Sequence, residues 1–384
     1  MARHVMECLG MSRVTVVDGR VVDVTEPKIR RCPLFEKYRG IESIDEEAVR
    51  SNVEYRIGAF GMCTEGRETT MRDFLSFGVS ETLSTGLRDG EFDAVVLAAD
   101  GCGTAVVHDP DVVQGLGGRI SGIVETEPIA AVVEAVGADN VLDPGTAAID
   151  MPAGAEKAFA MGLSKVAVTT ASVRDAETMR RRHGNSVVIA LVHTTGISRD
   201  DAEEAFEVCD IVTACASQHL REIAKATPGV LMAGRGVPVY GVTLAGKRLV
   251  RRRLEITGRR EWDPSQGEDP PYPLLRSIRL QREMGPRPQI DQRDPLLPQA
   301  PAELLVVGEH VGALLLGELH HRGVPGLHGR DDLVLPRKRQ RGLGVPVVEV
   351  LQLADERARN NDPGLAQQVL QGEVQVYPDL ERHQ

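Results

Sequence analysis

The amino-acid sequence predicts an α/β protein whose main domain is a doubly wound, mostly parallel sheet, and two observations carry this prediction. Short apolar runs, typical of strands that helices cover on both faces, recur at 94–99, 141–142, 166–170, 187–192, 211–214 and 237–242. The intervals between them contain amphipathic segments of crossover length, at 129–136, 155–161, 173–182, 199–208 and 218–226. We therefore expect a Rossmann-like domain over residues 91–256.

Residues 1–90 are expected to form an N-terminal β-hairpin and helices packed on this domain. The dipeptide Asp18-Gly19 lies between the β-rich runs 14–17 and 20–24, which is the signal for a two-residue type I′ turn. The chain should therefore open with an antiparallel pair of strands.

Two helices are expected between this hairpin and the main domain. Ser43, followed three residues later by Glu46, matches a capping box and predicts the start of the first helix. Apolar residues spaced three and four positions apart between Met71 and Leu87 predict the second.

A hairpin is expected to close the main domain. Runs 239–244 and 248–256 flank Ala245-Gly246, and the second run carries three consecutive arginines, 251–253. Positive side chains on an edge strand oppose pairing with other chains, which is our interpretation of these arginines. Anion binding is the alternative.

The composition changes near Thr257. All seven Phe and all six Cys precede this position, whereas 14 of the 22 Pro follow it. Because proline interrupts helices and central strands, residues 257–384 are interpreted as a Pro- and Gln-rich, largely disordered tail. Two explanations stay open, a natural extension and translation past a frameshift.

Composition excludes several function classes. The net charge is −11, and no run of Lys and Arg offers a surface for nucleic-acid phosphates. No stretch reaches the ~20 apolar residues of a membrane helix, and segment 1–10 lacks the apolar core of a signal peptide. We expect a cytoplasmic protein that binds neither nucleic acid nor membranes and keeps its six cysteines as thiols or metal ligands.

Small polar residues follow the apolar runs, at the edge where open α/β sheets bind ligands. These segments are 100–104, 125–127, 143–146, 169–172, 193–196 and 215–219. Ser172, Ser217 and Asp143 also fit ordinary roles as helix caps or turn formers. We expect one pocket at this carboxyl edge to collect the ligand-binding groups.

The loop 100–104 gives the most specific signal at this edge. Gly101 and Gly103 flank Cys102, so their amides could approach a small anionic ligand beside the thiol. Asp100 and Thr104 complete the loop. Cys102 is a candidate nucleophile or metal ligand, with core packing as the alternative.

Other segments are expected to complete the pocket. His193 ends an apolar run and could act as an acid, a base or a ligand, or be a hydrogen-bonded core residue. Cys102, Asp100 and His193 are therefore the catalytic candidates. Besides the 100–104 loop, the residues expected to contact a ligand or cofactor are Gly117, Gly118, Thr194, Thr195 and Gly196, although the two glycines could equally form a plain turn.

Several strong motifs are absent from the sequence. It has no dinucleotide-binding Gly-x-Gly-x-x-Gly after the first strand, no P-loop, no Cys-x-x-Cys pair and no His-Glu-x-x-His. The cysteines lie far apart, so a metal site would need ligands that the fold gathers. The sequence therefore identifies neither a cofactor nor a metal.

Six strings resemble the methanogenesis marker protein 8 family: CPLFEKYRG at 32–40, FGMCT at 60–64, DGCGT at 100–104, QGLGGRISG at 114–122, VHTTGIS at 192–198 and DIVTACAS at 210–217. The resemblance covers residues 1–256 and implies a cytoplasmic protein of methane-producing archaea. Cys32 and Cys63 lie inside these strings, which favours them, with Cys102, as candidate metal ligands. Cys102 stands where the resemblance implies a smaller residue, and the tail 257–384 resembles nothing in that family.

The expected function is that of a methanogenesis-associated accessory protein that binds a small anionic ligand or cofactor at the carboxyl edge of the sheet. The alternative is a non-enzymatic assembly or maturation factor that docks on a methanogenesis enzyme such as methyl-coenzyme M reductase. Whether the protein is an enzyme, and which reaction it would serve, stays open at this point.

Overall fold

The computed structural model describes residues 2–32, 36, 40–72, 78–119, 122–234 and 237–264, all within the first of two compact units, Met1–Val307. The second unit, Gly308–Gln384, lies outside the described residues, as does most of the predicted tail. Within the described part, Trp262 and Met232 exchange two backbone hydrogen bonds, at 2.8 and 3.1 Å. The chain therefore still packs on the sheet beyond residue 256.

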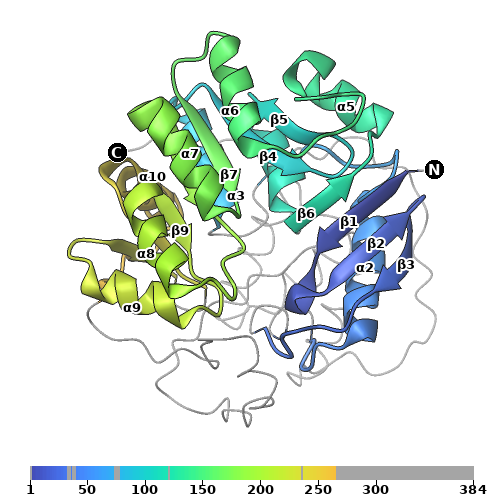
Figure 1. Ribbon diagram of the computed structural model, residues 1–384, viewed down its shortest axis with the longest axis horizontal. Helices are drawn as coiled ribbons and strands as arrows, with labels where there is room; N and C mark the ends of the chain where they lie inside the picture. Colours follow the sequence, from blue (N-terminus) through green and yellow to red (C-terminus); the bar gives the residue numbers. More distant parts are fainter. Residues whose placement is uncertain are drawn as a thin grey trace, which may run out of the picture. The chain divides into compact units, whose positions relative to one another are not determined.

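A seven-stranded mixed sheet forms the centre of this unit (Figure 1). Its strands are β4 (Ala94–Ala99), β5 (Gly103–Val107), β7 (Val166–Thr170), β8 (Val187–Leu191), β9 (Ile211–Thr213), β10 (Leu231–Ala233) and β11 (Val239–Gly241), in the order β10-β11-β9-β8-β7-β4-β5. The strands β4, β7, β8 and β9 pair in parallel, whereas β5, β11 and β10 pair antiparallel at the edges. The predicted α/β class is confirmed, with a parallel centre and antiparallel edges.

Helices cover both faces of this sheet because alternate strand residues point to opposite faces. Val96, Val168 and Ile189 face one group of helices, whereas Val95, Leu97 and Val188 face the other. The first group is α6 (Met151–Ala160), α7 (Val173–His183), α8 (Arg199–Val208) and α9 (Gln218–Ala226). The second group is α3 (Val79–Arg88), η2 (Val113–Gly118), α5 (Ala130–Val136) and α10 (Leu244–Ile256).

The winding of the sheet differs from the prediction. The parallel strands β4, β7, β8 and β9 follow one another across the sheet in chain order, and the connecting helices α6, α7 and α8 pack on one face. A doubly wound sheet instead reverses its strand order, and the reversal opens a ligand-binding crevice. The prediction of double winding is therefore wrong, and a switch-point crevice is absent from the described sheet.

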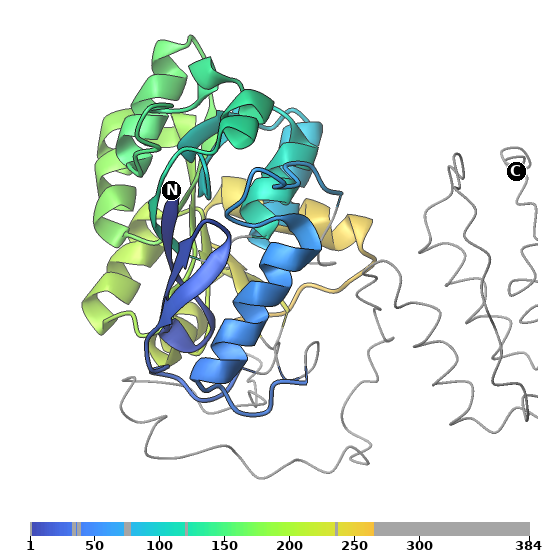
Figure 2. The same ribbon diagram turned by 90° about the vertical axis from the view of Figure 1, so that its right-hand side faces the viewer.

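A second, antiparallel sheet is built mainly from the start of the chain. It contains β1 (Arg3–Glu7), β2 (Arg13–Val17), β3 (Arg20–Val24) and β6 (Gly122–Thr126), in the order β3-β2-β1-β6. Helix α2 (Glu46–Phe60) packs against this sheet, as Figure 2 shows. Asp18 and Gly19 have φ angles of 50° and 70°, the left-handed conformation of a type I′ turn, so the predicted hairpin is confirmed. Strands β1 and β6 were not predicted.

Several local boundaries also differ from the predictions. Asp45, not Ser43, caps α2, because its Oδ1 accepts a hydrogen bond from the Ala48 amide over 2.8 Å. The helix predicted from Met71 begins at Val79, and residues 73–77 lie outside the described residues. The predicted strand 141–142 forms only an isolated β-bridge, in which Val141 pairs with Ala105. The shortest helical turns are η1 (Leu9–Met11), α4 (Pro110–Val112), η3 (Ala138–Asn140) and η4 (Gly184–Ser186).

The predicted closing hairpin is wrong, because residues 244–256 form the helix α10. Thr243 caps its first turn by accepting a hydrogen bond from the Gly246 amide over 3.2 Å. Its buried apolar residues, at 249, 250 and 254, have helical spacing. The arginines 251–253 are therefore not edge-strand residues. Arg252 pairs with Asp89 at 2.7 Å, and Arg253 is buried.

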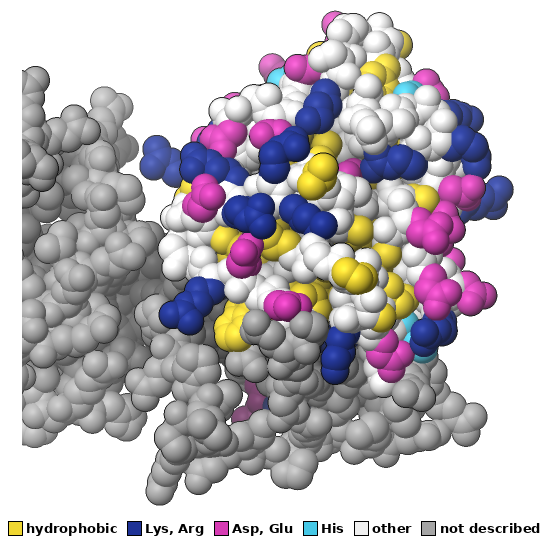
Figure 3. Space-filling view, turned by 90° about the vertical axis from the view of Figure 1, so that its left-hand side faces the viewer, with side chains coloured by type: hydrophobic (Ala, Val, Ile, Leu, Met, Phe, Trp, Pro, Cys, Tyr) yellow, Lys and Arg dark blue, Asp and Glu magenta, His cyan; other side chains and the backbone are white. Residues whose placement is uncertain are grey.

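The surface carries both signs of charge. Figure 3 shows basic and acidic side chains intermingled on the face that it presents. Among the described helices, none is long and apolar enough to cross a membrane.

Candidate functional site

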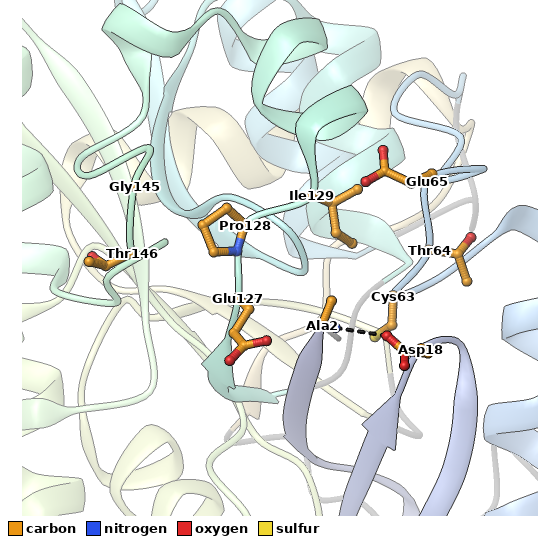
Figure 4. A pocket seen from close by; sticks show the side chains of 10 residues that line it. All are labelled: Ala2, Asp18, Cys63, Thr64, Glu65, Glu127, Pro128, Ile129, Gly145 and Thr146. Atoms are coloured by element: carbon orange, nitrogen blue, oxygen red, sulfur yellow. Dashed lines mark hydrogen bonds between the residues drawn. The ribbon is translucent and has the colours of Figure 1, made fainter.

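A pocket of about 810 Å³ lies where the antiparallel sheet meets three loops (Figure 4). Its volume falls within the range of about 300–1,000 Å³ that is typical of small-molecule sites. Two segments that the sequence placed at a ligand-binding edge, 125–127 and 143–146, contribute to its lining. The lining residues are Ala2, Asp18, Cys63, Thr64, Glu65, Glu127, Pro128, Ile129, Gly145 and Thr146.

The antiparallel sheet positions the first two of these residues. The Ala2 amide donates to Asp18 Oδ1 over 2.8 Å, the bond drawn in Figure 4, and the Asp18 amide donates to the Ala2 carbonyl oxygen over 3.0 Å. Asp18 is also the first residue of the type I′ turn. The hairpin therefore holds its carboxylate at the pocket wall.

Backbone amides hold the other two carboxylates of the lining. The Arg3 amide donates to Glu127 Oε2 over 2.7 Å, and the Glu127 amide donates to the Arg3 carbonyl oxygen over 3.1 Å. Glu65 Oε2 accepts a hydrogen bond from the Ala131 amide, in the first turn of α5, over 3.2 Å. Each carboxylate is thereby fixed through one oxygen, and the other oxygen can face a ligand.

The pocket wall is negatively charged. Asp18, Glu65 and Glu127 contribute carboxylates, and none of the lining residues is Lys, Arg or His. The neighbouring guanidinium of Arg3 pairs with Glu125. A wall of one sign attracts ligands of the opposite sign, so the pocket favours a positively charged group. Within the described ranges, no group of three His, Cys, Asp or Glu residues is arranged to hold a metal ion.

The loop after α2 connects the pocket to a buried ion pair. Cys63 lies in this loop with a φ angle of 63°, and its amide donates to Asp100 Oδ2 over 2.7 Å. Asp100 pairs with Arg67 Nε at 3.1 Å, and both side chains are 0% exposed. The other guanidinium nitrogens of Arg67 donate to the carbonyl oxygens of Glu68 and Gly115, over 2.6 and 3.0 Å. This hydrogen-bonded pair fixes the loop that carries Cys63.

The polar groups of the predicted 100–104 anion site form hydrogen bonds to other residues of the protein. The Gly101 amide donates to Thr126 Oγ1 over 2.9 Å, and Thr104 Oγ1 accepts a hydrogen bond from the Asp150 amide over 2.9 Å. A Cβ atom at Gly103 would lie 2.0 Å from the Ala147 carbonyl oxygen, so that carbonyl fills the space above Gly103. The described contacts therefore lend no support to an anion at this turn.

Cys102, the predicted nucleophile, is fully buried in the core between the sheet and α5. Burial raises the pKa of its thiol to about 12, and the negative charge of Asp100 adds to the shift. At pH 8 the thiol would then stay almost entirely protonated, whereas the thiolate is the reactive form.

We therefore expect slow alkylation of Cys102 in the folded protein, the reverse of what a catalytic thiol would show. Iodoacetamide at pH 8, followed by peptide mass spectrometry, should modify the half-buried Cys32 before Cys102. Unfolded protein provides the control, since both thiols should then react at similar rates. Faster modification of Cys102 in the native state would contradict its burial.

The second predicted segment lies elsewhere at the sheet edge. Thr194 Oγ1 donates to the Thr213 carbonyl oxygen over 2.6 Å and accepts a hydrogen bond from the Cys215 amide over 3.4 Å, so it ties β8 to β9. His193 is exposed and has a φ angle of 56°. Thr195 is half-buried and Gly196 exposed, and neither lines the pocket.

His193 and Asp100 are associated with opposite ends of β6. A Cβ atom at Gly122, at the start of this strand, would lie 3.9 Å from His193 Cδ2. Thr126, at its end, bonds to the turn that begins at Asp100. Four residues of strand span roughly 13 Å. The described contacts therefore do not bring the two predicted groups into one site.

The predicted glycines 117 and 118 have packing contacts instead of a place in the pocket. A Cβ atom at Gly117 would lie 3.3 Å from Leu97 Cδ2, and one at Gly118 would lie 2.9 Å from Gln114 Oε1. Both residues belong to the π-helical turn η2.

Sequence reasoning missed Asp18 and Glu65 as pocket residues. Asp18 was interpreted only as a turn former, although the turn that it forms projects its carboxylate beside the chain start. Glu65 follows the string 60–64, which the resemblance had already singled out. A search for acidic residues next to such strings could have found it.

Comparison with known proteins identifies relatives without a described function. The model of a family described as an uncharacterized protein conserved in archaea (DUF2099) matches residues 4–255. The uncharacterized protein MJ0054 of Methanocaldococcus jannaschii is 42% identical over 262 residues, which cover 66% of this chain and 92% of that protein. No solved structure matches the chain. The family match ends one residue before the boundary at 256 that composition indicates.

Proposed function

The chain belongs to a family of uncharacterized proteins conserved in archaea, and we propose that it is an accessory protein of archaeal metabolism. We further propose that it binds a small organic cation. One observation carries this proposal: three carboxylates, and no basic side chain, line a pocket of about 810 Å³. The association with methanogenesis is part of the proposal, and the resemblance to the methanogenesis marker protein 8 family supports it. The chemistry of the pocket assigns no reaction.

The ligand should combine positive charge with an aliphatic body. Carboxylates attract an ammonium or guanidinium group and accept its hydrogen bonds. Pro128, Ile129 and Ala2 supply apolar surface to the same pocket. Thr64 and Thr146 add groups that can bond to polar atoms of the ligand. An alkyl amine with several amino groups meets all these demands.

This ligand has the opposite charge to the one that the sequence suggested. The expectation of an anion rested on the glycine amides of the 100–104 loop. The Gly101 amide is bonded to Thr126, and the Ala147 carbonyl covers Gly103. The charge of the pocket lining therefore outweighs the loop pattern in choosing the ligand class.

Binding of the triamine spermidine tests the proposal, with Glu127→Gln as the variant. Calorimetry at low salt should detect spermidine binding that weakens as salt rises, because salt screens exposed charges. The variant should bind about tenfold more weakly, since it loses one hydrogen bond between charged groups, worth about 1.5 kcal/mol.

Glu207→Gln is the matched control, since Glu207 is an exposed carboxylate on α8 outside the pocket. It should leave spermidine binding unchanged. Equal weakening by both variants, or preferential binding of an anion such as ATP, would contradict the proposal. An empty pocket together with a stoichiometric protein partner after native purification would favour the alternative, a non-enzymatic assembly factor for a methanogenesis enzyme.

A further inference from the structure

His4, on β1, is a fully buried histidine with one unsatisfied ring nitrogen. Its Nδ1 lies 2.7 Å from Thr126 Oγ1 on the neighbouring strand β6. Its Nε2 has no hydrogen-bond partner among the residues that the structure describes, and the side chain is 0% exposed. Buried polar atoms are nearly always bonded, so an unpaired one indicates a missing partner.

The sheet register places His4 next to residues that line the pocket. Residues two apart in extended chain share a face, so His4 lies on the same face as Ala2, which precedes β1 and bonds to Asp18 in the adjoining turn. His4 pairs with Val16 across β1 and β2, and with Thr126 across β1 and β6. Ala2 and Asp18 line the pocket, and Thr126 immediately precedes the lining residue Glu127. His4 is therefore a buried neighbour of the lining residues Ala2 and Glu127.

The contacts of Thr126 are compatible with a proton on Nδ1 of His4. A hydroxyl group offers one donor and two acceptor positions. Thr126 Oγ1 accepts a hydrogen bond from the Gly101 amide at 2.9 Å and donates to the Glu127 carbonyl oxygen at 3.4 Å. We assign the hydroxyl proton to the Glu127 carbonyl oxygen, and with that assignment His4 Nδ1 donates to Thr126 Oγ1. Nε2 is left with a lone pair.

Burial keeps the ring neutral. It lowers the pKa of His4 below the ordinary value of 6.5, although the negative charges of Asp100 and Glu127 act in the opposite direction. A neutral imidazole with its proton on Nδ1 is a hydrogen-bond acceptor at Nε2.

We propose that His4 Nε2 accepts a hydrogen bond from the cationic ligand of the pocket, which makes His4 a ligand-binding residue. This inference rests on the proposed function and adds a residue to it. Three carboxylates provide charge at the pocket wall, and the buried imidazole next to the lining provides a neutral, directional acceptor. The ligand group that reaches Nε2 must therefore carry an N–H bond, as a primary or secondary ammonium does.

Nitrogen-15 NMR of the histidine rings tests the proposal on the unaltered protein. In the free protein, His4 should show a protonated Nδ1 and an unprotonated Nε2, the signals being assigned by their loss in His4→Asn. Addition of spermidine should shift the Nε2 signal. A protonated Nε2 in the free protein would overturn the inference.

The variant His4→Asn tests the same contact by affinity. Asparagine places its side-chain amide near the position of Nδ1, so it can keep the bond to Thr126 while lacking Nε2. Spermidine should bind at least about tenfold more weakly, the loss expected for a hydrogen bond to a charged group. His108→Asn is the matched control, because His108 bonds to the Asp93 carbonyl oxygen and lies outside the pocket.

The two proposals fail in different ways. A protein that binds no spermidine would contradict the proposed function. Spermidine binding that Glu127→Gln weakens, without any change at His4 Nε2 or in His4→Asn, would contradict only the role of His4.

Discussion

Replacing Asp100 by Ala should lower the free energy of unfolding by about 3–5 kcal/mol, because it leaves the buried guanidinium of Arg67 without its counter-ion. Both side chains are 0% exposed, and their closest contact is 3.1 Å. The substitution also removes the acceptor of the Cys63 amide, 2.7 Å away. Urea unfolding followed by circular dichroism measures the difference through the transition midpoint.

The exposed pair Arg181 and Glu177 on α7 provides the matched control. It is also a carboxylate paired with a guanidinium, at 2.8 Å, but both side chains are about half exposed. Glu177→Ala should cost less than about 0.5 kcal/mol, as exposed pairs four residues apart usually do. Similar costs for the two substitutions would contradict the importance of burial for the Asp100 pair.

Replacing Gly103 by Ala should lower the free energy of unfolding by about 2–5 kcal/mol. The added Cβ atom would lie 2.0 Å from the Ala147 carbonyl oxygen and 2.6 Å from that of Ala148. Overpacking of this kind costs about 1–3 kcal/mol. Gly103 also has a φ angle of 62°, and the left-handed conformation costs a non-glycine residue a further 1–2 kcal/mol or so.

Gly90→Ala separates the two contributions. Gly90 has a similar φ angle, 73°, but an added Cβ atom would meet nothing within 4 Å. Its substitution should therefore cost only the backbone term, about 1–2 kcal/mol. Thermal unfolding of both variants measures the difference, and equal costs would show that the loop 147–148 does not press on Gly103.

Local periodicity predicted the elements of the main domain well. Helices α8 and α9 have the predicted bounds, and β4 and β7 coincide with the predicted apolar runs. Within each of these segments, the spacing of the apolar residues follows from which face of that strand or helix is buried. Their order across the sheet depends on which strands pair, and no local pattern records that, so the winding was predicted incorrectly.

Long-range pairing also explains what was missed in the second sheet. His4 pairs with Thr126, 122 residues away, and only this pairing makes both segments strands of one sheet. Residues 122–126 include exposed Glu125, so the segment lacks a continuous apolar run. Ala245-Gly246 was interpreted as the turn of a closing hairpin, whereas both residues lie in the first turn of α10, where the Gly246 amide donates to the Thr243 cap.

The candidate site was predictable only in part. Glu127 and Thr146 lie in segments that the sequence placed at a ligand-binding edge, and both line the pocket. Asp18 and Glu65 reach the same pocket from the N-terminal hairpin and from the loop after α2. Their convergence depends on tertiary packing, which residue types and spacing do not encode.

The most direct test of a cation site in this pocket is a set of nuclear Overhauser contacts between spermidine and methyl-labelled protein. The lining predicts contacts from the methylene protons of spermidine to the methyl groups of Ala2, Ile129 and Thr146. These contacts should weaken in Glu127→Gln at the same concentrations, in line with its lower affinity. Contacts confined to methyl groups elsewhere, such as those of the exposed Leu244, would contradict the site.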